Sequence, residues 1–360
     1  MKKIIFGITS LQIGGAERVL VDLANRLCNI YDITIFTIYD NGKLKEQVNK
    51  NVKIISLYEK QFEEYNKMQI LKISLKLFFF TKVPKGYDTY VAFLEGPITR
   101  LFSKNKTNKK IAWVHNDISK VFGSGFSSKI KKNLDKSVYK KYDEIIFVSK
   151  ENQNDFNKIY GNNFDEVIIK NYIDYERIIE KSKEKIDCPF DENSINFVTS
   201  CRLVEQKGLD RFIRVHKRLQ DENLKSKVFV LGEGPLKQSL QNLVDKYNVT
   251  DSFIFLGAKT NPYPYISKAD YFCLFSYYEG YGMVLEEAKI LNKKILITDT
   301  AARESVEDYE NAQIFENSED GIYKGLKSVI LKKDDKNTFN ETKNWKEYYE
   351  KIIEGIVRIL

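Results

Sequence analysis

The stretch FSYYEGYGMVLEEA, residues 275–288, indicates how the chain folds around it. It overlaps an apolar run, Tyr271–Phe275, that is typical of a buried β-strand. Gly280 and Gly282 then free the backbone for a tight turn, and apolar side chains follow at helical spacing: Val284, Leu285, Ala288 and Leu291. A strand that leads through a glycine turn into an amphipathic helix predicts a βαβ unit in a parallel sheet covered by helices.

The same alternation of short apolar runs and longer helical patterns fills most of the chain. The strands expected before the middle are Lys3–Thr9, Ile33–Tyr39, Val52–Leu57, Thr89–Leu94, Ile111–His115, Ile145–Ser149 and Val167–Lys170. Those expected after it are Ile195–Ser200, Lys227–Leu231, Phe253–Leu256, Tyr271–Phe275 and Lys294–Thr298. We therefore predict an α/β fold with two doubly wound, Rossmann-like domains that face a central cleft.

A charged stretch interrupts the alternation and divides the two domains. The first domain is expected at residues 1–173, the linker at 174–194 and the second domain at 195–344. A final helix, residues 345–360, is long enough to pack back on the first domain.

Composition excludes several classes of protein. A hydrophobic content of 42% is too high for a disordered chain. No run of about 18 uncharged apolar residues occurs, so no transmembrane helix is expected. The four cysteines are scattered without paired spacing, which argues against a disulfide framework or a zinc site and fits a reducing cytoplasm.

The positive charge lies in the first half of the chain. Residues 1–174 hold 29 Lys and Arg against 19 Asp and Glu, a net charge of +10, and the remainder holds 29 against 31. Such a surface fits a solvated face, a nucleic-acid patch or a membrane-surface patch.

Four short motifs follow predicted strands, at the sheet edge where open α/β sheets bind ligands. GGAER places Gly14 and Gly15 at a helix start that suits a phosphate, and RLVEQKG projects Arg202 and Lys207, two cations that suit a diphosphate. LGEGP contains Gly232, and LGAK places Ala258 and Lys259 where backbone amides can contact a heterocycle. GGAER and LGEGP alone are equally compatible with an ordinary turn, and LGAK alone is a weak signal. The position of Arg202 and Lys207 at a strand end favours a functional role over an ordinary basic surface loop.

Two glutamates complete the pattern around the opening stretch. Glu279 lies in the turn and Glu287 on the second turn of the helix, where their carboxylates can accept hydrogen bonds from hydroxyl groups. A sugar, a diphosphate and a ribose laid end to end would use both carboxylates and the helix N-terminus between them.

The order of these five motifs resembles that of the retaining glycosyltransferases of family 4, which have the GT-B fold. The resemblance covers nearly the whole chain, and the Glu-x7-Glu spacing of Glu279 and Glu287 is that family's signature. One departure follows the strand Lys294–Thr298, where Ala301 and Ala302 occupy positions that are usually glycine.

The resemblance assigns expected roles on the donor side. Gly14 and Gly15 resemble the loop beside the donor phosphates, and Arg202 and Lys207 resemble the pair that holds the diphosphate. Glu279 resembles the carboxylate that binds the donor sugar, and Glu287 the ligand of the ribose. The remaining donor contacts expected are Gly232, Ala258 and Lys259, with the backbone of Gly280, Tyr281, Gly282 and Met283 lining the sugar.

The acceptor side is expected after two strands of the first domain. His115, followed by Asn116, ends one strand, and Glu95 follows another. The catalytic set expected is Arg202, Lys207, Glu279 and His115, where the two cations stabilise the leaving diphosphate. No Asp-x-Asp motif occurs in the chain, and neither a metal ion nor a cofactor is expected beside the nucleotide-sugar substrate.

The expected activity is transfer of a hexose or N-acetylhexosamine from a nucleotide-diphosphate sugar, with UDP favoured. The acceptor would be a glycan, undecaprenyl-linked, in synthesis of a bacterial surface polysaccharide such as a capsule. Lysines interleaved with apolar residues at 67–85 and 120–141 predict a peripheral position on the anionic cytoplasmic face of the membrane. The alternatives are a nucleotide-sugar epimerase of the same fold and, less favoured for lack of a recognition motif, a nucleic-acid-binding protein.

Overall fold

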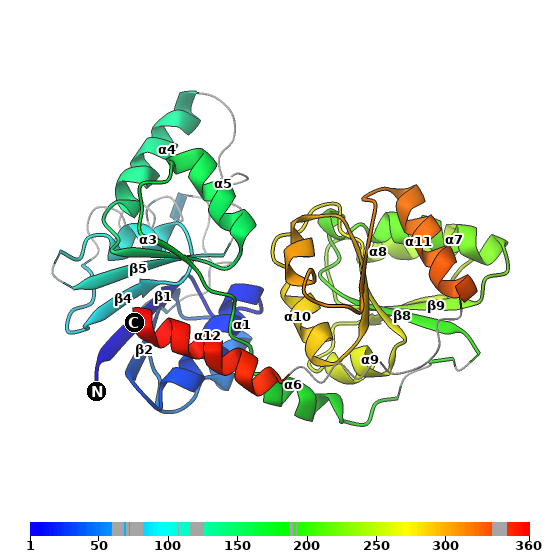
Figure 1. Ribbon diagram of the computed structural model, residues 1–360, viewed down its shortest axis with the longest axis horizontal. Helices are drawn as coiled ribbons and strands as arrows, with labels where there is room; N and C mark the ends of the chain where they lie inside the picture. The colour runs from blue at the N-terminus through cyan, green and yellow to red at the C-terminus, as the bar shows by residue number, and fades with distance from the viewer. Residues whose placement is uncertain are drawn as a thin grey trace. The chain divides into compact units, whose positions relative to one another are not determined.

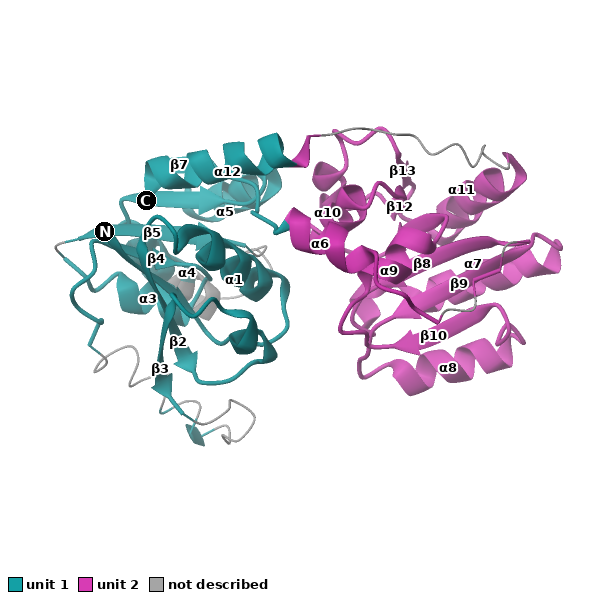
Figure 2. Ribbon diagram, turned by 90° about the horizontal axis from the view of Figure 1, so that it is seen from below, with its two compact units in different colours: residues 1–174, 346–360 teal, residues 175–345 magenta. Residues whose placement is uncertain are grey.

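The computed structural model describes residues 1–59, 68–69, 72, 82–106, 108–115, 126–187, 190–191, 193–332 and 344–360. The chain forms two compact units (Figures 1 and 2). Unit 1 consists of residues 1–174 and 346–360, and unit 2 of residues 175–345.

Unit 1 contains a parallel sheet with the strand order β3-β2-β1-β4-β5-β6-β7. Its strands are β1 (Lys3–Ile8), β2 (Asp32–Tyr39), β3 (Lys53–Tyr58), β4 (Thr89–Ala92), β5 (Lys109–Val114), β6 (Glu144–Phe147) and β7 (Glu166–Ile168). Its helices are α1 (Gly15–Leu27), η1 (Lys43–Gln47), α3 (Pro97–Phe102), α4 (Phe126–Tyr139), α5 (Lys150–Tyr160) and α12 (Trp345–Ile359).

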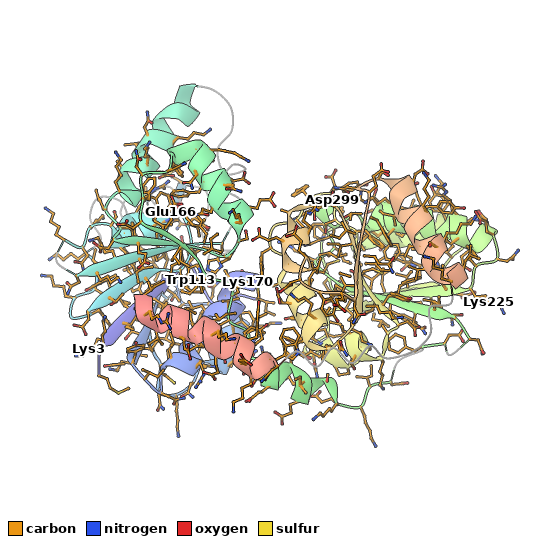
Figure 3. All side chains as sticks on the ribbon, viewed as in Figure 1. Lys3, Trp113, Glu166, Lys170, Lys225 and Asp299 are labelled. Carbon is orange, nitrogen blue, oxygen red and sulfur yellow. The ribbon has the colours of Figure 1, made fainter. Side chains whose placement is uncertain are left out.

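The core of unit 1 forms because its central strands are apolar on both faces. Every residue of β1 after Lys3 is buried, as parallel strands covered by helices require. The indole of Trp113 in β5, labelled in Figure 3, is 1% exposed and lies against Phe93, with ring centroids 4.7 Å apart. Helix α1 buries Val19, Leu20 and Leu23 on one face, which fixes its N-terminus beyond the end of β1.

Unit 2 contains a second parallel sheet with the order β10-β9-β8-β11-β12-β13. Its strands are β8 (Ile195–Ser200), β9 (Ser226–Leu231), β10 (Phe253–Gly257), β11 (Tyr271–Leu274), β12 (Lys294–Thr298) and β13 (Ala312–Phe315). Its helices are α6 (Tyr175–Ser182), η4 (Glu205–Lys207), α7 (Leu209–Asp221), α8 (Lys237–Lys246), α9 (Tyr263–Lys268), α10 (Met283–Ile290), η5 (Ala301–Ser305) and α11 (Glu319–Lys332). The prediction of an α/β fold with two Rossmann-like sheets is confirmed.

Each sheet has one point where the strand order reverses. In unit 1 it lies between β1 and β4, and in unit 2 between β8 and β11. The loops after such a pair of strands turn in opposite directions and leave a crevice at the carboxyl ends, which is where open α/β sheets bind ligands. The predicted site residues that follow β8 and β11 therefore meet at the reversal point of unit 2.

Helix α12 belongs to unit 1 although unit 2 separates it from the rest of that unit in sequence (Figure 2). It buries Tyr349, Ile353 and Ile356. Glu350 accepts two hydrogen bonds from the guanidinium of Arg26 in α1, at 2.7 and 2.9 Å, and the hydroxyl of Thr89 donates to the carbonyl of Leu360 at 2.9 Å.

Two segments differ from the sequence-based expectation. The range 174–194, predicted as a linker, begins with α6, which buries Ile178 and lies against α9 and α10 of unit 2. Strand β13 was not predicted, because this edge strand exposes Gln313 and Ile314 and so lacks a buried apolar pattern. Among the described residues no helix is long and apolar enough to cross a bilayer.

Candidate functional site

The loops after β8 and β11 run side by side at the reversal point of unit 2. The backbone N–H of Tyr277 donates to the carbonyl of Gln206 at 2.8 Å, and the amide of Gln206 donates to the carbonyl of Tyr278 at 3.1 Å. The first loop carries Arg202 and Lys207 and the second carries Glu279. These bonds fix the two predicted groups of residues against each other.

Lys207 and Glu279 form an ion pair between these loops. The Lys207 Nζ lies 2.5 Å from Glu279 Oε2, and the hydroxyl of Ser276 donates to the same oxygen at 3.0 Å. The side chains are 17% and 11% exposed, so the pair is largely shielded from water yet open on one side. Arg202, by contrast, is exposed, and its side chain makes no ion pair or hydrogen bond with any other described residue.

Glu287 faces a different part of unit 2. It lies in α10, and its Oε1 accepts a hydrogen bond from the hydroxyl of Tyr263 in α9 at 3.2 Å. A tyrosine in this position was not predicted, and the sequence NPYPYI gives no sign of the contact. The pair offers a carboxylate and a phenol to a hydroxyl-bearing ligand.

Glu286, which precedes Glu287 in α10, is buried. Its side chain is 3% exposed, its Oε1 accepts from the hydroxyl of Tyr281 at 2.7 Å, and Lys289 Nζ lies 3.3 Å from Oε2. Lys289 also donates to the carbonyl of Ser305 at 2.7 Å and to Asp308 Oδ1 at 3.2 Å. The side chain of Tyr281 thus anchors α10, which leaves its backbone as the part available to a ligand.

Glycines let the loops of unit 2 approach closely. Gly232 has φ +143°, and a Cβ built there would collide with the carbonyl oxygen of Cys201 in the neighbouring loop. Gly282 has φ +69° and begins α10. A Cβ on Gly282 would lie only 3.3 Å from the methyl of Ala302, so the glycine lets Ala302 pack against this turn. Gly280 has open space around it.

We expect Gly232→Ala to destabilise unit 2 by on the order of 3 kcal/mol, because both its φ and the close carbonyl exclude a methyl group. Gly280→Ala is the matched control, since a Cβ there meets nothing within 4 Å, and its unfolding midpoint should equal that of the parent. Urea denaturation measures both. Equal midpoints for the two variants would contradict the packing described for Gly232.

Ala258 and Lys259 follow β10 and are exposed. The amine of Lys259 lies 5.5 Å from the centroid of the Tyr265 ring. The preceding Gly257 has φ +73°, which turns the chain away from the strand and leaves these two residues at the sheet edge. They are at the same edge as the loops after β8 and β11, because all these strands are parallel.

In unit 1 the predicted phosphate loop follows β1. Gly14 caps α1 and Gly15 is its first residue. The carboxylate of Glu17 in the first turn folds back toward Gly14, where a Cβ would collide with it. Burial raises the pKa of Glu17 above its usual range. An anion arriving at this helix end would therefore meet Glu17 first.

Glu95 and His115 follow neighbouring strands β4 and β5 and are brought together. Glu95 Oε1 accepts a hydrogen bond from the backbone N–H of His115 at 2.5 Å. The imidazole lies 4.6 Å from the ring of Phe93, and its Nε2 is buried without a hydrogen-bond partner in the described part of the chain. Burial lowers the pKa of His115 to about 3, so the ring is neutral at pH 7. Asn116 lies outside the described residues.

Two doubly wound sheets, each with a reversal point, are the architecture of GT-B proteins. The chain matches the model of the family "Glycosyl transferases group 1" over residues 166–351, just over half of its length. The chain belongs to this family and is a glycosyltransferase.

A relative agrees with this class, and solved structures agree with the fold. An undecaprenol-dependent enzyme from Campylobacter jejuni, N-acetylgalactosamine-N,N'-diacetylbacillosaminyl-diphospho-undecaprenol 4-alpha-N-acetylgalactosaminyltransferase, is 29% identical over 348 residues, covering 93% of this chain and 92% of that protein. Sucrose-phosphate synthase from Thermosynechococcus elongatus superposes with a TM-score of 0.77 at 12% identity, over 100% of this chain and 99% of that one. Anabaena HepE, in complex with UDP and glucose, gives 0.71 at 15% identity over 94% and 92%. The two structures show the GT-B fold.

Proposed function

We propose that this protein is a retaining transferase of family 4 that moves an N-acetylhexosamine from a UDP-sugar to an undecaprenyl-linked glycan in bacterial polysaccharide synthesis. The observation that carries the proposal is the Lys207–Glu279 pair at the reversal point of unit 2, with the exposed Arg202 in the same loop as Lys207. The sugar and the acceptor are taken from the Campylobacter relative's name, and UDP from the HepE complex.

Different residues of unit 2 would bind the diphosphate, the sugar and the ribose of the donor. The guanidinium of Arg202 makes no hydrogen bond or ion pair with a described residue, so it can form a forked contact with phosphate oxygens without breaking another contact. Lys207 adds a point charge and Glu279 accepts from sugar hydroxyls, which requires the donor to insert between them. Glu287 and Tyr263 would hold the ribose.

The reaction would break the bond between the sugar C1 and the β-phosphate oxygen. The acceptor hydroxyl attacks C1 from the face that the diphosphate leaves, and its proton passes to a diphosphate oxygen, so the configuration at C1 is retained. Arg202 and Lys207 stabilise the charge that develops on the diphosphate, which is the largest contribution expected of the protein. His115, neutral because of its burial, would orient a hydroxyl rather than supply a proton. No metal ion or cofactor is part of the proposal.

A lipid-linked acceptor would be met at the membrane surface, and the net charge of +10 in residues 1–174 supports binding to an anionic leaflet. We therefore include a peripheral position on the cytoplasmic face. Most of the segment 67–85 and residues 120–125 of the segment 120–141 lie outside the described residues.

The test of the proposal is a panel of nucleotide sugars offered with an undecaprenyl-diphosphate-linked saccharide. Glycoside formation from UDP-N-acetylgalactosamine or UDP-N-acetylglucosamine, with the α-configuration preserved, is the expected result. Release of a free epimer with no glycoside from any acceptor would instead identify an epimerase.

The two glutamates are expected to act on different parts of the donor. Glu279→Gln should lower sugar transfer at least tenfold and change UDP affinity little, because UDP lacks the sugar. Glu287→Ala should weaken UDP binding about tenfold, since it removes the ribose ligand. Isothermal calorimetry with UDP, beside transfer rates, separates the two effects. An equal loss of UDP affinity in both variants would show that the roles are divided wrongly.

A further inference from the structure

Arg211 in α7 is a buried guanidinium that sequence analysis did not connect with the site. Arg211 is only 3% exposed. Nε and Nη2 donate to the carbonyl of Phe275 at 3.1 and 2.8 Å, and Nη2 also donates to the carbonyl of Ser276 at 2.7 Å and to Asn317 Oδ1 at 2.8 Å. The guanidinium carbon lies 4.2 Å from the centroid of the Tyr277 ring. A buried cation thus contacts three consecutive residues of one loop.

Two further contacts fix the same loop. The amide of Asn317, after β13, donates to the carbonyl of Tyr277 at 3.0 Å, and the hydroxyl of Tyr277 donates to Asp210 Oδ2 at 2.9 Å. Residues 275–277 are therefore held at each carbonyl and at the tyrosine ring. The loop reaches Glu279 only two residues later, so its path determines where that carboxylate lies.

The neighbouring loop also has hydrogen bonds of its own that do not involve Arg211. The backbone N–H groups of Lys207 and Gly208 donate to the carbonyls of Val204 and Glu205 at 3.1 and 3.0 Å. Gly208 has φ +60°, and a Cβ there would collide with the carbonyl oxygen of Phe275, the same oxygen that Arg211 binds. The absence of that side chain lets the carbonyl come within reach of the guanidinium.

We propose that Arg211 is a positioning residue that sets the place of Glu279 relative to Lys207. The inference rests on the proposed function, in which these two groups act on the donor sugar and its diphosphate. Arg211 acts through Glu279 and does not itself touch the donor. An arginine suits this position because Nε and Nη2 of one planar fork bind the carbonyl of Phe275 together while the guanidinium lies over the Tyr277 ring, a combination that the ammonium of a lysine does not offer.

The first test compares Arg211→Lys with Arg218→Lys. Arg218 lies two turns further along α7, pairs with Asp320 at 2.8 Å and lies 4.0 Å from the Tyr323 ring centroid, so it is a matched arginine away from the site. Arg211→Lys should lower kcat for UDP-N-acetylgalactosamine at least tenfold and change the Kd for UDP less than twofold, because Lys207 and its loop stay in place. Arg218→Lys should leave both unchanged. Normal kcat in Arg211→Lys would overturn the inference.

The second test is a double-mutant cycle, because its result differs between a residue that acts through Glu279 and one that only stabilises the fold. If Arg211 acts through Glu279, then Arg211→Lys should lower kcat less than twofold further when Glu279 is already glutamine. If kcat of the double variant falls by the product of the two single-variant losses, the inference is overturned and the donor site assignment stays intact. Normal transfer by Glu279→Gln alone would overturn the assignment of Glu279 itself. If Arg211→Lys fails to fold, Asn317→Ala enters the same cycle, with the same two outcomes.

Discussion

Replacing Lys207 by alanine is expected to lower turnover at least 100-fold while the protein stays folded. The ammonium is 17% exposed, so water screens it little, and it opposes the charge that forms on the departing diphosphate. The loss corresponds to about 3 kcal/mol of transition-state stabilisation. Arg202→Ala should have a loss of similar size, because it removes the second cation from the same loop.

The two variants differ in what they leave behind. Lys207→Ala leaves the Glu279 carboxylate without its cation, so its thermal midpoint should fall, whereas Arg202→Ala breaks no contact with a described residue and should not change it. Lys237→Ala is the control for kcat, since Lys237 is an exposed lysine of α8 paired with Glu233. Steady-state kinetics and calorimetric melting provide both readings. Near-normal turnover in both variants would show that this loop does not form the donor site.

The second large effect is expected on stability, from Lys289→Ala. The Lys289 side chain is 0% exposed and the Glu286 side chain 3%, and the amine also binds the carbonyl of Ser305. Removal of one partner from a buried ion pair leaves an uncompensated charge, which costs about 3–5 kcal/mol. Urea unfolding should therefore show a large loss in unit 2.

A matched pair of controls separates burial from charge. Lys351→Ala breaks an exposed pair with Glu347 at 2.7 Å and should leave the midpoint unchanged. The double replacement Glu286→Leu with Lys289→Met should recover part of the lost stability, since neither charge then remains buried. A double variant less stable than Lys289→Ala would mean that the other contacts of Lys289, rather than the charge left on Glu286, cause the loss.

The central strands of both sheets could be predicted from sequence because they are buried on both faces. Such strands appear as apolar runs between helical patterns, and each of the twelve expected runs overlaps a strand of the structure, β8 and β12 with identical bounds. Edge strand β13 lacked this signal because its middle residues are exposed. The predicted site residues of unit 2 follow parallel strands, so their meeting at one sheet edge followed from topology.

The supporting residues could not be predicted, because their roles depend on contacts distant in sequence. Arg211 lies in the helical pattern LDRFIRVHKRL, which contains three other basic side chains that look equivalent, and only the fold places it beneath Phe275, 64 residues away. Glu286 and Glu287 are adjacent in the sequence, and consecutive residues of a helix point in different directions. Glu286 therefore lies in the core beside Tyr281, and Glu287 points toward Tyr263.

The return of α12 to unit 1 has a consequence for how the protein is made. Residues 346–360 leave the ribosome only after all 171 residues of unit 2, 175–345, have been synthesised. At ordinary rates of translation that interval lasts roughly 10 to 30 s. During it unit 1 lacks the helix that buries Tyr349, Ile353 and Ile356, and unit 2 gains its complete sequence at the end of the interval. Unit 2, although it begins second in the chain, thus has its complete sequence before unit 1 does.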